Sequence, residues 1–350
     1  MTSTSEAVPL TAAELQLHPE FPHVNWKLIP TKRGKVAAAK CRGGPVNIAY
    51  EVHGNGPAHI VVSNLSSIDR SNIISSHELP GLRIRRYGWV LRLKIKVVHQ
   101  KELYEYCELI NGLLPLMRYS TSEMAKDIIE VLDQLNWKKE RQLNVVGISM
   151  GGMISQELGL LIPKRIASLS LVSTAAAIEN TVGLIENLRN RINLFMPRSL
   201  DAQIVMIKHN LFSPEWLSRP DECEFVEDKF PTNGDRIGAG EVAKRLDTKS
   251  YTKRGFICQA IAAGWHHKTP EQLASLGDQV GRERIMVIHG GIDRMITFPH
   301  AHVLIQGLGG EGSGMTIKLE PGQGHVIPIE MRQTFNGWVE ELIEKAERLS

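Results

Sequence analysis

Long apolar runs and an excess of charge are both absent from this sequence. No run approaches the roughly 18 consecutive apolar residues that cross a bilayer, and residues 1–20 lack the basic stretch and apolar core of a secretory signal. Lys and Arg number 41 against 38 Asp and Glu, so the net charge is only +3 over 350 residues. That balance requires neither nucleic acid nor an anionic membrane as a partner. We therefore expect a cytoplasmic protein with no transmembrane segment and no nucleic-acid partner.

Cysteine is scarce as well, and its spacing excludes several kinds of site. The four cysteines form no C-x-x-C pair, which argues against a zinc cluster and against a disulfide framework. The pair His266-His267 is not a metal motif either, because adjacent residues on a helix point in different directions and no carboxylate recurs at ligand spacing. We predict reduced thiols and neither a metal nor an organic cofactor.

The chain does contain a regular alternation of helical and strand patterns. Apolar runs typical of buried strands occupy residues 143–147, 167–172, 284–288 and 315–319, and amphipathic segments follow them. This alternation predicts a parallel sheet that helices cover on both faces. Two short runs at 35–41 and 46–52 predict a hairpin before that sheet, and 60–63 predicts a further strand.

The domain organisation follows from where the strand patterns stop. Residues 173–282 contain several amphipathic helical stretches with Pro- and Asp-rich joints and no strand pattern. We interpret them as a helical cap inserted into a core made of residues 35–172 and 283–350. Residues 1–34 are predicted to be an N-terminal extension that packs on a domain without carrying its core.

One motif points directly to chemistry. Residues 147–152 read Gly-Ile-Ser-Met-Gly-Gly, a G-x-S-x-G between a Val-rich strand and a helix. The tight turn requires small residues, here Gly147 and Gly151, on either side of Ser149. It lifts the serine hydroxyl clear of the sheet and directs the N-terminus of the next helix at any negative charge that develops there.

A serine hydroxyl is a weak nucleophile at neutral pH and needs a histidine base with a carboxylate to orient it. Asp293 follows the strand at 284–288 in the sequence His-Gly-Gly-Ile-Asp. His325 follows the next strand in the sequence Gly-Gln-Gly-His. The alternative interpretation of Asp293 is a cap of the helix after it, and Glu179 is the alternative acid.

These three motifs, in the order serine, aspartate, histidine, resemble the α/β-hydrolase superfamily. The resemblance covers about residues 46–67 and 115–350. It implies an α/β-hydrolase fold, a doubly wound and mostly parallel sheet with an inserted helical cap after the sixth strand. It also implies a catalytic triad of Ser149, His325 and Asp293.

The oxyanion hole of such a site needs two backbone N–H groups. The resemblance assigns the first to Met150, the residue after the nucleophile. The second belongs to the loop after the third strand, where Leu65 is our candidate and Asn64 a supporting residue. This chain has no His-Gly or Gly-rich sequence there, so the oxyanion region departs from the family pattern.

The resemblance breaks off between residues 68 and 114, where a helix, a fourth strand and a D-x-R-G-type turn are not recognisable. Residues 81–96 are instead basic and alternating. That pattern is typical of an amphipathic strand or hairpin with a solvated cationic face. A basic membrane-surface or partner-binding element, and an exon or reading-frame error, are the other interpretations.

Together these residues predict a serine hydrolase, esterase- or lipase-like, that cleaves a small or medium apolar ester or related acyl compound. Its partner is then a small-molecule acyl substrate, while the oligomeric state is not predicted. Acyl transfer or C–C hydrolysis by the same triad, and a pseudo-hydrolase that only binds, are the alternatives. Apolar cap side chains are expected over the site: Leu184, Leu188, Leu194, Phe195, Met206, Trp216 and Trp265.

Overall fold

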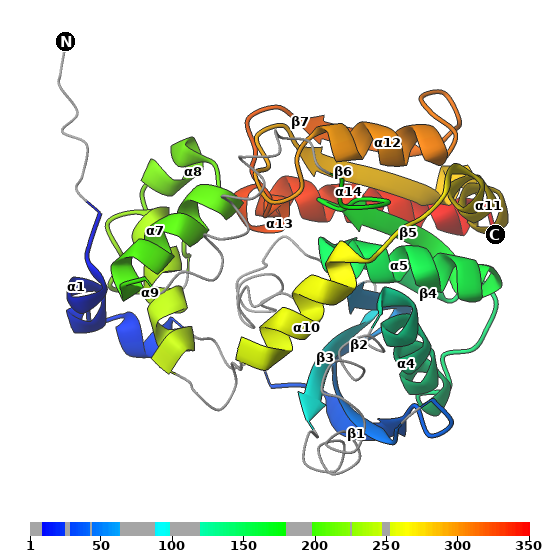
Figure 1. The fold of residues 1–350 in the computed structure, drawn as a ribbon, viewed down its shortest axis with the longest axis horizontal. Helices are drawn as coiled ribbons and strands as arrows, with labels where there is room; N and C mark the ends of the chain where they lie inside the picture. Colours follow the sequence, from blue (N-terminus) through cyan, green and yellow to red (C-terminus); the bar gives the residue numbers. More distant parts are fainter. Residues whose placement is uncertain are drawn as a thin grey trace, which may run out of the picture.

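A computed structural model describes residues 9–24, 29–42, 44–63, 88–98, 120–179, 198–224, 226–246 and 253–350. Within them seven strands form one sheet (Figure 1). The strands are β1 (Lys32–Ala38), β2 (Val46–Ser63), β3 (Gly88–Val98), β4 (Leu143–Ile148), β5 (Ile166–Val172), β6 (Ile285–Gly290) and β7 (Thr316–Glu320). Five of these, β2, β4, β5, β6 and β7, pair in parallel in that order.

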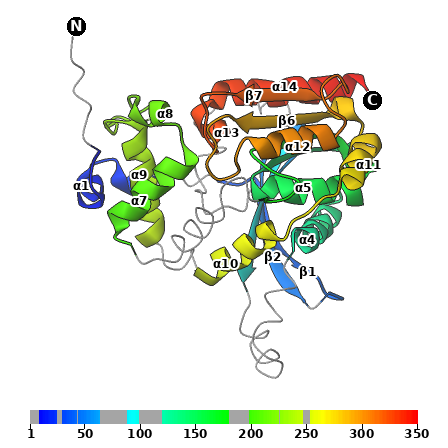
Figure 2. The ribbon, with the colours of Figure 1, turned by 45° about the horizontal axis from the view of Figure 1, so that its top comes forward.

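Helices lie on both faces of the parallel strands (Figure 2). They are α4 (Thr121–Gln134), α5 (Met150–Leu161), α11 (Pro270–Val280) and α12 (Pro299–Gly307) on one face, and α13 (Ile327–Glu330) and α14 (Arg332–Arg348) on the other. Successive strand residues therefore enter different cores: Val145 packs with the first group of helices and Val146 with the second. The predicted doubly wound sheet is confirmed.

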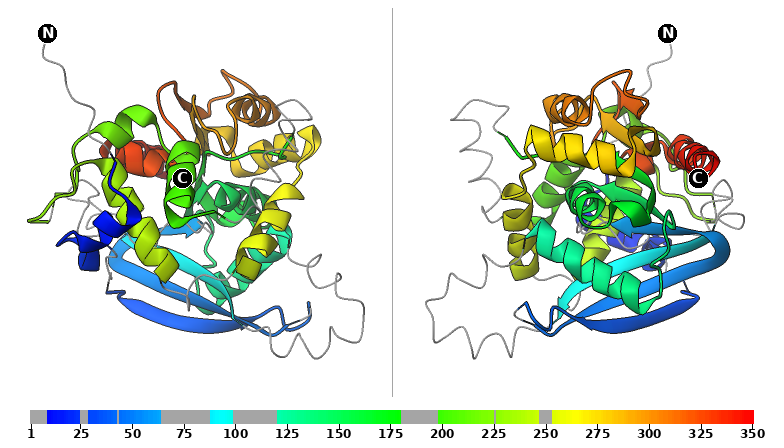
Figure 3. Two further views of the ribbon diagram at one scale, coloured as in Figure 1. Left: turned by 60° about the vertical axis from the view of Figure 1, so that its left-hand side comes forward. Right: turned by 90° about the vertical axis from the view of Figure 1, so that its right-hand side faces the viewer.

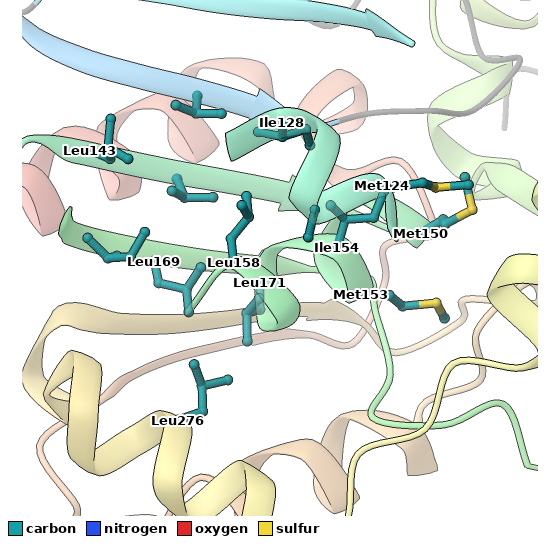
Figure 4. Close-up of a cluster of buried hydrophobic side chains, with 14 of the residues drawn as sticks. Met124, Ile128, Leu143, Met150, Met153, Ile154, Leu158, Leu169, Leu171 and Leu276 are labelled. Atoms are coloured by element: carbon teal, nitrogen blue, oxygen red, sulfur yellow. The ribbon is translucent and has the colours of Figure 1, made fainter. Parts of the chain in front are cut away.

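Burial explains why these elements could be recognised from their residues. Every residue of β4 and β5 is buried, which suits the mostly apolar composition of parallel strands. Helix α4 begins where the Ser120 hydroxyl accepts the Glu123 N–H at 3.2 Å. Figure 4 shows Ile128 of α4 beside Ile154 and Leu158 of α5, in the larger of the two cores.

At the N-terminal edge of the sheet the structure differs from the sequence prediction. The two strands expected at 46–52 and 60–63 form one 18-residue strand, β2. Gly54 takes a left-handed φ of 85°, and the pairing register shifts between His53 and Pro57. The turn signal at residues 54–57 predicts a strand end, whereas Gly54 bends β2 without ending it.

Strand β3 stands in the region where the resemblance called for a fourth strand. It pairs with β2, and Leu91 is in register with both Val52 and Val61. β3 therefore lies between the two halves of β2, and its cyan ribbon runs beside the blue ones in Figure 3. The strand interpretation of the basic segment is confirmed for residues 88–96. Residues 64–87, with Asn64 and Leu65, and residues 99–119 lie outside the described part of the chain.

Between β5 and β6 the described residues form helices and connecting loops with one isolated bridge and no strand, as expected for the helical cap (Figure 1). The helices among these residues, up to Gly264, are α7 (Leu200–Leu211), α8 (Pro214–Ser218), α9 (Asn233–Leu246) and α10 (Lys253–Gly264). Residues 180–197, which include four of the predicted cap side chains, are not among the described residues: Leu184, Leu188, Leu194 and Phe195.

The boundary of the cap at residue 282 needs correction. Helix α11 falls inside the predicted insertion, yet Leu273 and Leu276 join the core that covers the sheet. Gly159 of α5 has no side chain where Leu276 packs against it. An amphipathic pattern reveals that a helix has a buried face but not which domain covers that face. The cap therefore ends before Pro270.

The N-terminal extension also behaves differently from the prediction, because it supplies part of a core. Helix α1 (Ala12–Leu17) packs on the cap, and Leu15 is fully buried in a cluster with cap residues. The Leu10 N–H donates to Asp235 of α9 at 3.1 Å, and the Ala12 N–H donates to Asp201 of α7 at 2.6 Å.

A buried polar cluster joins the end of the cap to α5. His266 is 4% exposed, and its Nδ1 lies 2.9 Å from the Thr121 hydroxyl. Glu157 of α5 accepts from Thr121 at 3.3 Å and pairs with Lys268 at 2.7 Å. Burial, with smaller effects of Lys268 and His267, lowers the pKa of His266 to about 3. His266 is therefore a neutral structural residue.

We expect His266→Gln to remove a pH dependence of stability. The unfolded His266 titrates near 6.5 and the folded one near 3, so the unfolded state binds more protons between these values. Wild-type stability is therefore lost as pH falls through that window. Gln does not titrate. The unfolding free energy of the wild type minus that of the variant should therefore fall by about 2 kcal/mol between about pH 7 and about pH 5.

Urea denaturation at the two pH values measures this difference. His302→Gln, at an exposed position, is the matched control and should leave the pH dependence unchanged. A difference in unfolding free energy between the wild type and His266→Gln that stays constant with pH would contradict the lowered pKa of His266.

Candidate functional site

Ser149 lies in the turn between β4 and α5 with φ 57° and ψ −125°, a backbone conformation that residues other than glycine rarely adopt. Its N–H donates to the Val172 carbonyl at 2.9 Å, and its own carbonyl accepts the Thr174 hydroxyl at 2.8 Å. The end of β5 therefore holds the strained turn in place. This is the conformation that the G-x-S-x-G motif predicts.

Two glycines give this turn its room. A Cβ on Gly147 would lie 2.6 Å from the Gly151 carbonyl oxygen. Gly152, which the sequence reasoning did not single out, is equally restricted, because its Cβ would lie 2.6 Å from Thr174. The Gly151 carbonyl accepts the Ser155 hydroxyl at 2.8 Å, while the steric need for glycine at 151 stays a prediction.

Backbone hydrogen bonds continue past the ends of the strands and join the loops that follow them. The Ser173 N–H donates to the Ile288 carbonyl at 2.8 Å, so the loop after β5 is fixed to β6. The Gly291 N–H donates to Glu320 at 2.7 Å, which fixes the loop after β6 to β7. Carboxyl ends of parallel strands meet at one edge of a sheet, the usual place for a site in this kind of fold.

At this edge the structure brings Asp293 and His325 together. The His325 Nδ1 lies 2.7 Å from Asp293 Oδ2, and both side chains are buried. The other carboxylate oxygen, Oδ1, accepts the N–H groups of Met295 at 2.8 Å and Ile296 at 2.9 Å. A carboxylate only accepts hydrogen bonds, so His325 carries its proton on Nδ1 and leaves Nε2 as a proton acceptor.

Asp293 does not cap the helix after it, because the cap residue of α12 is Phe298; Asp293 ties the turn before that helix and binds His325. Glu179, the alternative acid, has its N–H bonded to His300 Nε2 at 3.1 Å instead.

The contact between Ser149 and His325 stays a prediction, because the structure has no hydrogen bond between these two described residues. Met150 is the first residue of α5, where N–H groups are positively polarised. The second proposed donor, Leu65, lies outside the described residues.

Two further side chains at the site were missed from the sequence. His289 is fully buried, with Nε2 2.8 Å from the Ile296 carbonyl and 3.5 Å from Asp293 Oδ2. Burial lowers the pKa of His289, against the opposing effect of Asp293, so a neutral ring packs beside the carboxylate. Glu330 is buried next to the His325 loop. A single polar residue in an apolar segment has no local pattern that marks it; the position of His289 in His-Gly-Gly-Ile-Asp was the one available signal.

Among the described residues, no group of His, Cys, Asp and Glu is arranged to hold a metal ion. None of the described helices is long and apolar enough to cross a membrane.

Comparison with known proteins matches residues 114–330 to a family model described as the alpha/beta hydrolase fold. A hydrolase from Pseudomonas aeruginosa PA01 superimposes with a TM-score of 0.59 at 21% identity, over 89% of this chain and 98% of its own. A serine hydrolase from Cycloclasticus zankles superimposes with a TM-score of 0.62 at 16% identity, over the same shares of the two chains. At these identities the likeness shows the fold.

One curated relative is the dihydrolipoyllysine-residue acetyltransferase component of the acetoin cleaving system of Pseudomonas putida. It is 25% identical over 221 residues, which are 63% of this chain and 50% of that protein. The chain spans about half the length of the first curated relatives it matches.

Replacing Gly147 by alanine should destabilise the protein by about 2 kcal/mol, because the added methyl meets backbone that cannot move aside. Gly337→Ala is the matched control: that glycine lies in α14 with open space around its Cβ position. Alanine there should be neutral or stabilising, by up to about 1 kcal/mol. Denaturant unfolding measures both, and equal effects of the two substitutions would contradict the steric explanation.

Proposed function

Since the chain belongs to the α/β-hydrolase family, we propose that it is a serine hydrolase that cleaves a small or medium apolar ester, or a related acyl compound. The observation that carries the proposal is the buried hydrogen bond between Asp293 and His325 at the edge of the sheet that also holds Ser149. That pair gives the site an oriented imidazole whose Nε2 bonds to none of the described residues, and a serine nucleophile needs such an acceptor.

In the proposed mechanism the Ser149 hydroxyl attacks the carbonyl carbon while His325 Nε2 takes its proton. The Asp293 carboxylate stabilises the imidazolium that forms. Met150 N–H, and an N–H of the loop around Leu65, hold the oxyanion. The alcohol leaves with the proton from His325, and water then attacks the acyl-enzyme by the same steps. These steps use no metal and no organic cofactor.

The cap gives the proposed substrate class only general support. Trp216 is buried and stacked on Phe212, with ring centroids 5.3 Å apart, so it stabilises the cap rather than facing a substrate. Met206 is partly buried on α7, while Trp265 is 63% exposed and free to contact a ligand. The apolar character of the substrate therefore rests mainly on the composition of the cap.

Acyl transfer is the second candidate, because the relative from Pseudomonas putida is named as an acetyltransferase component. In that reaction a thiol or alcohol replaces water as the acceptor of the acyl group from Ser149, so the first half of the mechanism is unchanged. A product assay with added thiol distinguishes the two: transfer yields the thioester, and hydrolysis yields the free acid.

We expect Ser149→Ala and His325→Ala each to lower the hydrolysis of p-nitrophenyl butyrate by at least about 1000-fold, because the nucleophile and the base act as one unit. Ser218→Ala and His302→Ala, at exposed positions, are the matched controls and should keep wild-type rates. Release of nitrophenol is followed by absorbance. Substantial activity in Ser149→Ala would sink the proposal, and a folded but inactive parent would favour the pseudo-hydrolase.

Asp293→Asn should lower kcat about 10,000-fold with little loss of stability. The amide NH₂ replaces the acceptor oxygen that faces His325 Nδ1, so Nδ1 becomes the acceptor. The neutral imidazole then carries its proton on Nε2 and cannot take the proton of Ser149. Glu179→Gln, a change of the alternative acid, should leave kcat unchanged. If Glu179→Gln caused the loss and Asp293→Asn did not, the acid would be misassigned.

A further inference from the structure

The loop that carries His325 is bonded to the cap in both directions. The N–H groups of His325 and Val326 donate to the Leu211 carbonyl at the end of α7, at 2.8 Å and 3.3 Å. In the opposite direction, Glu330 Oε1 accepts the Ser213 N–H of the cap at 3.2 Å and the Gly324 N–H of the loop at 3.2 Å. One carboxylate thus bridges the cap and the residue before the proposed base.

Packing at this bridge is close enough to exclude a side chain. A Cβ on Gly324 would lie 2.7 Å from the Leu211 carbonyl oxygen and 2.8 Å from Glu330 Oε1. Val326 joins an apolar cluster with Leu211 and other cap residues. The loop that carries Asp293 is attached to the same part of the cap, because the Arg294 guanidinium donates to the His209 carbonyl at 2.6 Å. Both loops of the proposed site are therefore anchored on residues 209–213 of the cap.

A carboxylate is an unfavourable group to bury here, and its partners explain why it is tolerated. Glu330 is 6% exposed, and burial raises its pKa. Hydrogen bonds from Ser213 and Gly324 act in the opposite direction, while the charge of Asp293 raises the pKa further. Without Glu330, two N–H groups in a buried region would lose their acceptor.

We propose that Glu330 is a positioning residue that fixes the His325 loop against the cap, so that the imidazole is aligned with Ser149. The proposal rests on the proposed function of Ser149 and His325 and adds a specific link to it.

Glu330→Met tests this link, because methionine has a similar length but offers no oxygen to the two N–H groups that Oε1 accepts. We expect kcat for p-nitrophenyl butyrate, per active site titrated with a fluorophosphonate, to fall about 100-fold, with KM within about twofold of the wild type. Glu341→Met, an exposed change in α14, should behave as the wild type. Glu330→Gln keeps an oxygen that can occupy the Oε1 position, and it should therefore lose much less kcat than Glu330→Met. A wild-type kcat per titrated site in Glu330→Met would overturn the proposal.

Amide hydrogen exchange gives a readout that does not depend on activity. In Glu330→Met, exchange at residues 211–213 and 324–326 should become faster, while β4 and α5 keep their protection. Unchanged protection in both segments would overturn the proposal even if the protein is a hydrolase. If the wild type cleaves no ester, faster exchange would still support the link while the proposed function fails, so the two failures are distinguishable.

Discussion

At the carboxyl edge of the sheet, backbone packs directly against backbone, and the geometry of the site depends on that contact. A Cβ on Gly291 would lie 2.6 Å from the Pro321 carbonyl oxygen, and the Ile292 N–H donates to Gln323 at 3.1 Å. Glycines are required because any side chain would separate the two loops. The close approach carries Asp293 within hydrogen-bond distance of His325, although the residues are far apart in the chain.

The turn at Ser149, between the neighbouring strands, also depends on close packing that requires glycines. Its strained backbone persists because β5 holds it through Val172 and Thr174, and because Gly147 and Gly152 leave room for α5 to begin at once. The hydrogen bonds to the end of β5 thus maintain the unfavourable backbone conformation of Ser149. The cap is joined to these loops by hydrogen bonds as well as by apolar contact, so it is part of the arrangement that orients the proposed base.

Elements that are buried on both sides could be predicted from sequence, because β4, β5 and β6 are mostly apolar runs with turn signals around them. The three glycine-flanked motifs were recognisable for a related reason, since each needs small residues at fixed positions next to the polar one. Other features depend on partners distant in the chain. β3 is defined by pairing with both halves of β2, α11 by the domain that covers it, and Glu330 by two N–H groups from different segments. No local pattern encodes those partners.

Activation of Ser149 by the Asp293–His325 pair is tested by treating the purified protein with a fluorophosphonate, weighing the intact product and mapping the modified peptide by mass spectrometry. We expect a single adduct, located on Ser149, that does not form in His325→Ala. An adduct on another serine, or none on a protein shown to be folded, would contradict it.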